Sequence, residues 1–172
     1  GKYEGVKKSV RAAFKILNER SDVVYVIAGD GRYYKKLQAY ADANSPNEDV
    51  RKRICILGHV DSVSSLYRQA DVFMYFSYQD GYPNVILEAM SHRLPVVTND
   101  AVGMSEQIIH ERTGIFVNTN DPGEIRAQVT LLLDNPEKRE MLGSAAQTQI
   151  NCANSHRVVG EKYVQELRTL IN

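Results

Sequence analysis

Apolar residues recur along the chain with two alternating spacings. The first residues follow the three-to-four-residue spacing of a helix face, at Val6, Val10, Ala13 and Leu17. Residues 23–28 then form a β-branched and aromatic run, typical of a buried parallel strand. The same alternation continues to residue 117. The predicted strands are residues 23–28, 54–57, 72–76, 95–98 and 114–117. The predicted helices between them lie near residues 37–41, 63–70 and 105–109, with a further helix that starts near Pro83 or Asn84.

This alternation predicts an α/β fold: a doubly wound, Rossmann-like parallel sheet with right-handed crossovers. The ligand crevice of such a sheet lies beyond the carboxyl ends of its strands. After residue 117 only helical spacing remains, in three segments near residues 125–133, 141–148 and 159–170, and Asp121-Pro122 and Asn135-Pro136 are expected to start two of them. We find no repeat or boundary and expect residues 1–172 to form one domain with a helical C-terminal segment.

Composition excludes several classes of protein. The 172 residues are 43% hydrophobic and 24% charged, as in an ordinary globular domain. Lys plus Arg and Asp plus Glu both number 21, so no net field favours nucleic acid, and an anionic ligand must be held locally. Cys55 and Cys152 lack CxxC spacing, so we expect reduced, buried thiols.

The chain also lacks an apolar stretch long enough to span a bilayer and a signal-peptide pattern, so we expect a cytoplasmic protein. It starts at Gly1-Lys2-Tyr3 without an initiator Met, which suggests a fragment of a longer protein.

Two glycine turns follow the first two predicted strands. Gly29-Asp30-Gly31 allows the backbone to bend and to approach a ligand closely. A dinucleotide fingerprint would need a third glycine where Tyr34 stands, so a nicotinamide site is disfavoured, and a plain tight turn remains the alternative. Gly58-His59 ends the next strand in the same way. Because the four histidines lie on unrelated elements, we expect no metal site.

The segment from Asp80 to Glu88 places two carboxylates eight positions apart around a helix start. Pro83 or Asn84 is expected to begin the helix, whose first N–H groups and dipole favour an anion. If Pro83 is the first helical residue, Tyr82 is the cap, and the N–H groups stay available for a ligand. If Asn84 is the cap, a purely structural role for the two acids is favoured instead. Asp80 then interacts with the helix dipole, and Glu88 is an exposed helix acid.

The segment Asp80-Gly81-Tyr82-Pro83-Asn84-Val85-Ile86-Leu87-Glu88-Ala89-Met90 resembles the donor-binding half of family 4 retaining glycosyltransferases with the GT-B fold. Residues 29–31, 57–60, 66–72, 94–97 and 113–117 are similar to the same family, in the same order. The resemblance therefore covers nearly the whole chain.

The resemblance implies a site for a UDP- or GDP-sugar that needs no metal. Glu88 would bind the ribose hydroxyls, Asp80 would face the transferred sugar, and both are expected to be catalytic. The backbone of Asn84, Val85 and Ile86 would hold the diphosphate. The remaining nucleotide-sugar-binding residues implied are Gly29, Gly31, Gly58, His59, Gly81, Tyr82 and Pro83.

The resemblance further implies a hexosyltransferase that retains the anomeric configuration and serves polysaccharide biosynthesis. A leaving phosphate oxygen would help to take the proton of the attacking acceptor hydroxyl. The acceptor, a glycan or lipid-linked saccharide, would bind a missing N-terminal domain, so the fragment itself is expected to be inactive. Peripheral membrane contact stays open for the full-length protein.

The chain departs from the family pattern at three positions. Asp80 replaces a Glu, Arg93 replaces a helix-ending Gly at a strain cost of about 1 kcal/mol, and Glu4 replaces a Lys. An Arg on the family's opening strand would precede this chain, and Lys2 could supply a substitute cation. Two alternatives therefore remain open: a non-catalytic module of assembly or regulation, and a sugar-nucleotide epimerase.

Overall fold

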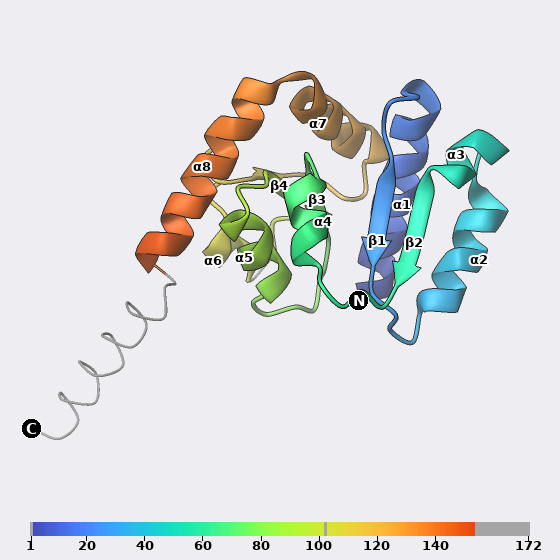
Figure 1. Cartoon of the computed structure of the whole chain (residues 1–172), viewed down its shortest axis with the longest axis horizontal. Helices are drawn as coiled ribbons and strands as arrows, with labels where there is room; N and C mark the ends of the chain where they lie inside the picture. Colours follow the sequence, from blue (N-terminus) through green and yellow to red (C-terminus); the bar gives the residue numbers. More distant parts are fainter. Residues whose placement is uncertain (1, 102, 154–172) are drawn as a thin grey trace, which may run out of the picture.

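The computed structural model describes residues 2–101 and 103–153 (Figure 1). The helices are α1 (Lys2–Glu19), α2 (Tyr34–Asn44), α3 (Glu48–Lys52), α4 (Ser64–Gln69), α5 (Asn84–Ser91), α6 (Met104–Gln107), α7 (Pro122–Asp134) and α8 (Pro136–Ala153). The strands are β1 (Tyr25–Ala28), β2 (Ile54–Gly58), β3 (Phe73–Tyr75), β4 (Val96–Thr98) and β5 (Ile115–Phe116). The α/β alternation predicted from the sequence is confirmed.

Every paired strand is parallel, but the described strands form two sheets rather than one. β1 pairs with β2, and β3, β4 and β5 follow one another in the second sheet. The parallel strands and intervening helices predicted from the sequence are therefore present, although β1 and β3 share no hydrogen bonds in the part of the chain that is described.

Helix α1 joins the two sheets through two apolar stripes. Val10 and Leu17 pack into the core cluster that contains Ile54 of β2. Ala12 and Ile16 pack into the cluster that contains the central strands of the other sheet. Since residues three and four apart share a helix face, residues 10 and 17 cover one sheet while residues 12 and 16 cover the other.

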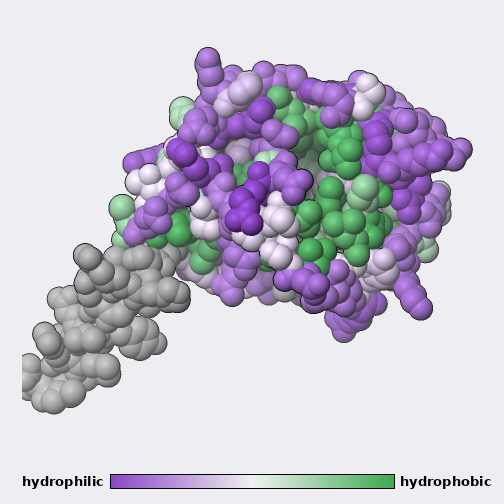
Figure 2. All heavy atoms as spheres, viewed as in Figure 1, coloured by the Kyte–Doolittle hydropathy of each residue, from purple (hydrophilic) through white to green (hydrophobic). Residues whose placement is uncertain are grey.

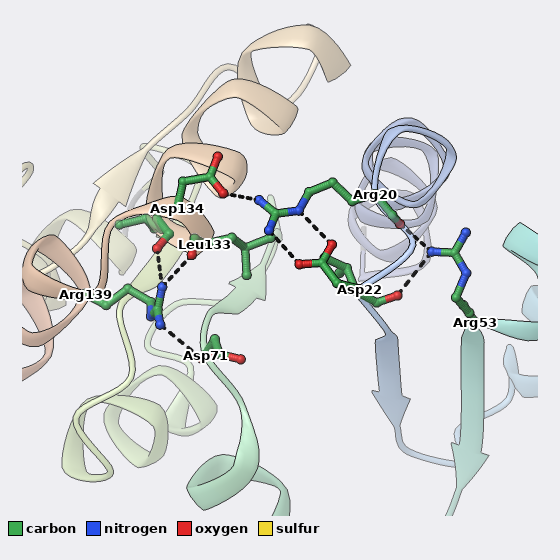
Figure 3. A network of polar contacts seen from close by, with 9 residues as sticks. Arg20, Asp22, Arg53, Asp71, Leu133, Asp134 and Arg139 are labelled. Atoms are coloured by element: carbon green, nitrogen blue, oxygen red, sulfur yellow. Dashed lines mark hydrogen bonds and ion pairs between the residues drawn. The ribbon is translucent and has the colours of Figure 1, made fainter.

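A network of ion pairs and hydrogen bonds links the segment between α1 and β1 to the end of α7 (Figure 3). Arg20, directly after α1, contacts Asp22 before β1 and Asp134 at the end of α7. Arg139 of α8 donates to the carbonyl of Leu133 at 2.7 Å. The side chains that link the segment before β1 to the end of α7 therefore fix the sheets' relative positions at this edge.

The C-terminal helices start where the sequence predicts. The Asp121 carboxylate accepts from the Gly123 N–H at 2.8 Å, and the Asn135 amide oxygen accepts from the Lys138 N–H at 2.8 Å. The third predicted helical segment, residues 159–170, lies outside the described residues.

Two local expectations differ from the structure. Helix α3 was not expected, although Asn47 accepts from the Val50 N–H and so caps it. Cys55 and Cys152 are free, but neither is buried as expected: Cys55 is half-buried, and Cys152 is exposed because it lies near the end of α8.

Tyr25 gives the fold a predicted dependence on alkaline pH. Its hydroxyl donates to the Ser9 hydroxyl at 2.8 Å, and burial raises the pKa of Tyr25 to about 12. Unfolded tyrosine titrates near 10. The stability that this neutral phenol contributes is therefore complete below about pH 10 and is lost between about pH 10 and pH 12, because the unfolded chain ionises first. The unfolding free energy is expected to fall between pH 9 and pH 11.5. In Tyr25→Phe this fall should be smaller by roughly 1–2 kcal/mol, measured by urea denaturation at the two pH values.

Candidate functional site

The start of α5 has backbone donors for which the described residues supply no acceptor. The helix begins at Asn84, and buried Pro83 occupies the N-cap position without a side-chain hydrogen bond. The sequence left two candidates for the cap, Tyr82 and Asn84, and neither residue occupies that position. The Ile86 N–H donates to the Pro83 carbonyl at 3.1 Å, so this expected diphosphate donor already has a partner. Among the described residues, no acceptor bonds the N–H groups of Asn84 and Val85. This terminus retains the character of an anion site.

Asp80 is held on one side of this terminus. Its carboxylate is half-buried and accepts from the Tyr75 hydroxyl at 2.6 Å. Burial and the nearby carboxylate raise the pKa of Tyr75 well above its ordinary value, so Tyr75 remains a neutral donor. Because Tyr75 ends β3, the strand fixes the position of the acid that follows it.

Glu88 is held in a similar way one turn inside α5. Its Oε2 atom accepts from the Tyr67 hydroxyl of α4 at 3.0 Å. Burial, followed by the charge of Glu88, raises the pKa of Tyr67 well above its ordinary value. The side chain of Glu88 is otherwise exposed, and the described residues provide no donor to its Oε1 atom. One carboxylate oxygen is therefore oriented while the other can accept from a ligand.

An aromatic row connects the two acids. The rings of Tyr67 and Phe73 meet edge to face with centroids 5.6 Å apart, and the rings of Phe73 and Tyr75 are parallel at 6.5 Å. Sequence reasoning assigned both tyrosines only to the apolar pattern. The tyrosine hydroxyls could have indicated a contact with the acids, because a buried tyrosine hydroxyl usually has a hydrogen-bond partner.

His92 supports the other end of α5. Its Nε2 atom lies 2.7 Å from the Ser64 hydroxyl and its Nδ1 atom 2.8 Å from the Glu88 carbonyl oxygen. The imidazole also packs on Tyr67, with ring centroids 5.3 Å apart. The contact between α4 and α5 that orients Glu88 is therefore fixed at several points.

The segment after β4 supports the turn before α5. Gly103 has a φ of 87°, and a Cβ atom there would lie 2.0 Å from the Gly81 carbonyl oxygen. The buried Gln107 of α6 donates from Nε2 to the Pro83 carbonyl at 3.2 Å. The backbone carbonyl of Gln107 accepts from the side-chain Nε2 of Gln149 in α8 at 2.8 Å. Neither Gly103 nor Gln107 was expected in the site, because only the tertiary fold brings residues 103–107 against residues 81–83.

Gln107→Leu is expected to lower the unfolding free energy by about 1–3 kcal/mol, because it removes the side-chain donor to the Pro83 carbonyl. Urea denaturation measures the change. Gln69→Leu is the matched control, since the Gln69 amide is exposed and, among the residues described, bonds only the Ser65 carbonyl of its own helix. Equal stability of the two variants would show that the Gln107 bond does not support the turn.

The two glycine turns form a second group of predicted residues. Gly29 and Gly58 have φ values of 130° and 72°, and the Gly29 N–H donates to the Gly58 carbonyl at 2.7 Å. A Cβ atom added at Gly31 would have no neighbour within 4 Å. The Nε2 atom of exposed His59 lies 3.4 Å from the Oδ1 atom of Asp61. The loops after β1 and β2 and the loop leading into α5 lie along the lower edge of Figure 1. No hydrogen bond joins the two groups within residues 2–101 and 103–153.

The departures from the family pattern have clear local structures. Arg93 has a φ of 61°, so the left-handed backbone that the sequence indicates is confirmed. Its guanidinium donates to Glu140 at 2.8 Å. Glu4 lies 3.5 Å from Lys7, one turn along α1. Within the described residues, no group of three or more acidic, His or Cys side chains could hold a metal ion, and no helix is long and apolar enough to cross a membrane.

Comparison with known proteins identifies one family. The family model described as "Glycosyl transferases group 1" matches residues 1–149. An uncharacterized glycosyltransferase of Methanocaldococcus jannaschii is 33% identical over 149 residues, which are 86% of this chain and 37% of that protein. The GDP-mannose-dependent monoacylated alpha-(1-6)-phosphatidylinositol monomannoside mannosyltransferase of Corynebacterium glutamicum is 25% identical over 96% of this chain and 44% of its own length.

The fold is also found in solved structures. The Anabaena protein HepE in complex with UDP superposes with a TM-score of 0.80 and 19% identity over 92% of this chain and 44% of that chain. This likeness shows the Rossmann-like arrangement of a GT-B glycosyltransferase. The present chain therefore spans less than half the length of these relatives.

Proposed function

Because the chain belongs to the glycosyl transferases group 1 family, we propose that it is the donor-binding half of a retaining glycosyltransferase. It binds a UDP- or GDP-sugar, and the intact enzyme moves the sugar to a glycan or lipid-linked acceptor. The observation that carries this proposal is the start of α5, where the uncapped N–H groups of Asn84 and Val85 lie between two acids, each bonded to a tyrosine hydroxyl. HepE, which binds UDP, and the GDP-mannose-dependent relative support a nucleotide donor.

The donor is held by groups with separate tasks. The N–H groups of Asn84 and Val85, with the positive end of the α5 dipole, bind the diphosphate. The Oε1 atom of Glu88 accepts from a ribose hydroxyl while Tyr67 holds Oε2. Asp80 faces the transferred sugar. Because Asp80 is one methylene shorter than a glutamate, its reach to the sugar differs, and Tyr75 sets its direction.

The same groups favour breakage of the bond between the sugar and the diphosphate. Negative charge accumulates on the leaving diphosphate, and a preorganised helix terminus stabilises that charge without rearranging. The acceptor oxygen attacks on the face from which the diphosphate leaves, so the anomeric configuration is retained. A phosphate oxygen accepts the acceptor's proton, and no metal is required.

The acceptor is held by an N-terminal domain of the intact enzyme. Transfer requires donor and acceptor in one fixed geometry, so residues 1–172 bind donor without transferring its sugar. Calorimetric titration of UDP and GDP into residues 1–172 tests donor binding. Saturable heat is expected for at least one of them, with uridine and guanosine as controls that lack the diphosphate. Absence of heat for both nucleoside diphosphates at millimolar concentration would exclude the donor site in this chain.

Glu4 favours a second candidate, a glycosyltransferase-like module without transfer activity. The family pattern implies a diphosphate-binding cation there, whereas Glu4 pairs with Lys7. Product analysis of the intact protein with donor and acceptor distinguishes the candidates: a new glycosidic bond supports the enzyme, and bound but unchanged donor supports the module. Change of the donor sugar without an acceptor would instead identify an epimerase.

A further inference from the structure

A cavity lies at the amino ends of β3 and β4, on the edge of their sheet opposite the start of α5. Its volume is about 320 Å³, and the ends of α4 and α5 and the start of α8 surround it. Asp71 lines it just before β3 begins, and Pro95 lines it directly before β4. Because α5 has eight residues, about 12 Å of helix separates the cavity from the uncapped N–H groups. The cavity is therefore distinct from the site at the start of α5.

Three arginines line this cavity, one from each surrounding segment. They are Arg68 in α4, Arg93 after α5 and Arg139 in α8, and we call the space between them the arginine cavity. The carboxylates of Asp71 and Glu140 also line it, so cations exceed acids by one among the described lining arginines and acids. Figure 2 shows mainly hydrophilic residues over α4, α5 and α8, whose ends meet here. The arginine cavity therefore suits a polar ligand with a negative charge.

The arginines differ in how firmly the fold holds them. Arg139 donates from Nη1 to the Leu132 and Leu133 carbonyls at 2.7 Å, and its Nη2 atom lies 3.4 Å from Asp71 (Figure 3). Arg68 is exposed, and the described residues give its guanidinium no hydrogen-bond or ion-pair partner. Arg139 thus holds one cation in a fixed position. Arg68 keeps the donors of its guanidinium for a ligand or for water.

Arg93 places a guanidinium at the cavity at a conformational cost. Its φ of 61° is in the left-handed region, where a non-glycine residue loses about 1 kcal/mol or more. Its partner Glu140 is 65% exposed and Arg93 itself 51% exposed, and such exposed pairs contribute only about 0–1 kcal/mol. The ion pair therefore does not account for an arginine at this position. Strained residues of this kind are typical of ligand sites.

The arginine cavity shares a wall with the side chains that support Glu88. Tyr67 and His92 both line it. The Tyr67 hydroxyl donates to Oε2 of Glu88 at 3.0 Å, and Nδ1 of His92 lies 2.8 Å from the Glu88 carbonyl oxygen. A ligand in the cavity would therefore contact the side chains that orient Glu88.

We propose that the arginine cavity is a second ligand site, which binds a small sugar phosphate. Arg68 and Arg93 bind the phosphate, because a guanidinium can donate two parallel hydrogen bonds to phosphate oxygens. Asp71 and Glu140 accept from the sugar hydroxyls. The same two carboxylates repel a ligand with many negative charges, so a single phosphate is favoured. A volume of about 320 Å³ lies within the range of small-molecule sites.

Calorimetric titration of glucose 6-phosphate into the intact protein tests the site. Saturable heat is expected at millimolar concentration or below. Arg68→Gln is expected to weaken this binding by about 10-fold or more, because it removes charged hydrogen bonds to the phosphate. Arg11→Gln is the matched control and should bind as the parent does. Arg11 is also an exposed helix arginine without a partner among the described residues, and it lies outside the cavity.

A second variant and two smaller probes define the contacts. Arg93→Gly should weaken binding by a similar factor, and its urea denaturation midpoint should not fall, because glycine adopts this backbone without strain. Glucose lacks the phosphate and inorganic phosphate lacks the hydroxyls, so each should bind at least about 10-fold more weakly than glucose 6-phosphate.

Three outcomes would overturn the inference. Absence of saturable heat for glucose 6-phosphate at millimolar concentration would exclude the site. Equal affinity in Arg68→Gln and the parent would place the bound ligand elsewhere in the protein. Inorganic phosphate that binds as tightly as glucose 6-phosphate would show that the sugar makes no contact. None of these measurements uses a nucleotide, so this inference and the proposed function fail independently.

Discussion

Glu88→Gln is expected to weaken binding of the preferred nucleoside diphosphate by about 10- to 100-fold, measured by calorimetry. A hydrogen bond to a charged acceptor contributes about 1.5–3 kcal/mol, and the substitution removes the charge that accepts from ribose. The amide can still accept from Tyr67, so the contact between α4 and α5 is retained. In the intact enzyme, kcat/KM is expected to fall by a similar factor or more.

Two controls separate the ribose role from a general effect on the fold. Glu48→Gln removes an exposed helix acid whose one ion pair in the described part of the chain is with Lys52, so donor affinity should not change. Inorganic pyrophosphate has no ribose, so its affinity should be unchanged or slightly higher in Glu88→Gln. If Glu88→Gln binds the nucleoside diphosphate as tightly as the parent chain, Glu88 does not contact the donor. Equal weakening of pyrophosphate binding would instead indicate disruption of the α5 terminus.

Gly5→Ala is expected to lower the unfolding free energy by about 3 kcal/mol or more, measured by urea denaturation. The unfolding free energy of a small domain is about 5–15 kcal/mol, so a loss of about 3 kcal/mol is a large fraction of it. In an open helix the same change would stabilise by about 1 kcal/mol. Here the new methyl group would lie 1.8 Å from the Phe76 carbonyl oxygen and 3.4 Å from the Ser77 nitrogen, so α1 and the end of β3 must separate.

Gly31→Ala is the matched control for this prediction. Gly31 lies in an exposed turn, and nothing lies within 4 Å of the position of an added Cβ atom. We expect its unfolding free energy to change by less than about 1 kcal/mol. If Gly5→Ala proves as stable as Gly31→Ala, α1 does not approach β3 this closely. The position of α1 against the residues that follow β3 would then need revision.

The order of helices and strands could be predicted because it follows from local rules. Spacing of apolar residues separates helix from strand, and a proline after a capping side chain, as at Asp121-Pro122, marks a helix start. The start of α5 was predicted to within one residue for the same reason. The short helix α3 was missed because its five residues have too little apolar periodicity to distinguish it from a turn.

The sequence by itself determined the alternation of elements, the position of the α5 start to within one residue and the two acids around it, because these depend on residues adjacent in the chain. Only the tertiary structure decided that Tyr75 and Tyr67 bond Asp80 and Glu88, and that Gln107 holds the Pro83 carbonyl. The division of the described strands between two hydrogen-bonded sets was likewise invisible in the pattern, because each strand is apolar whether or not its edge is paired. Such contacts depend on how the packed layers bring distant residues together, and no local spacing encodes that arrangement.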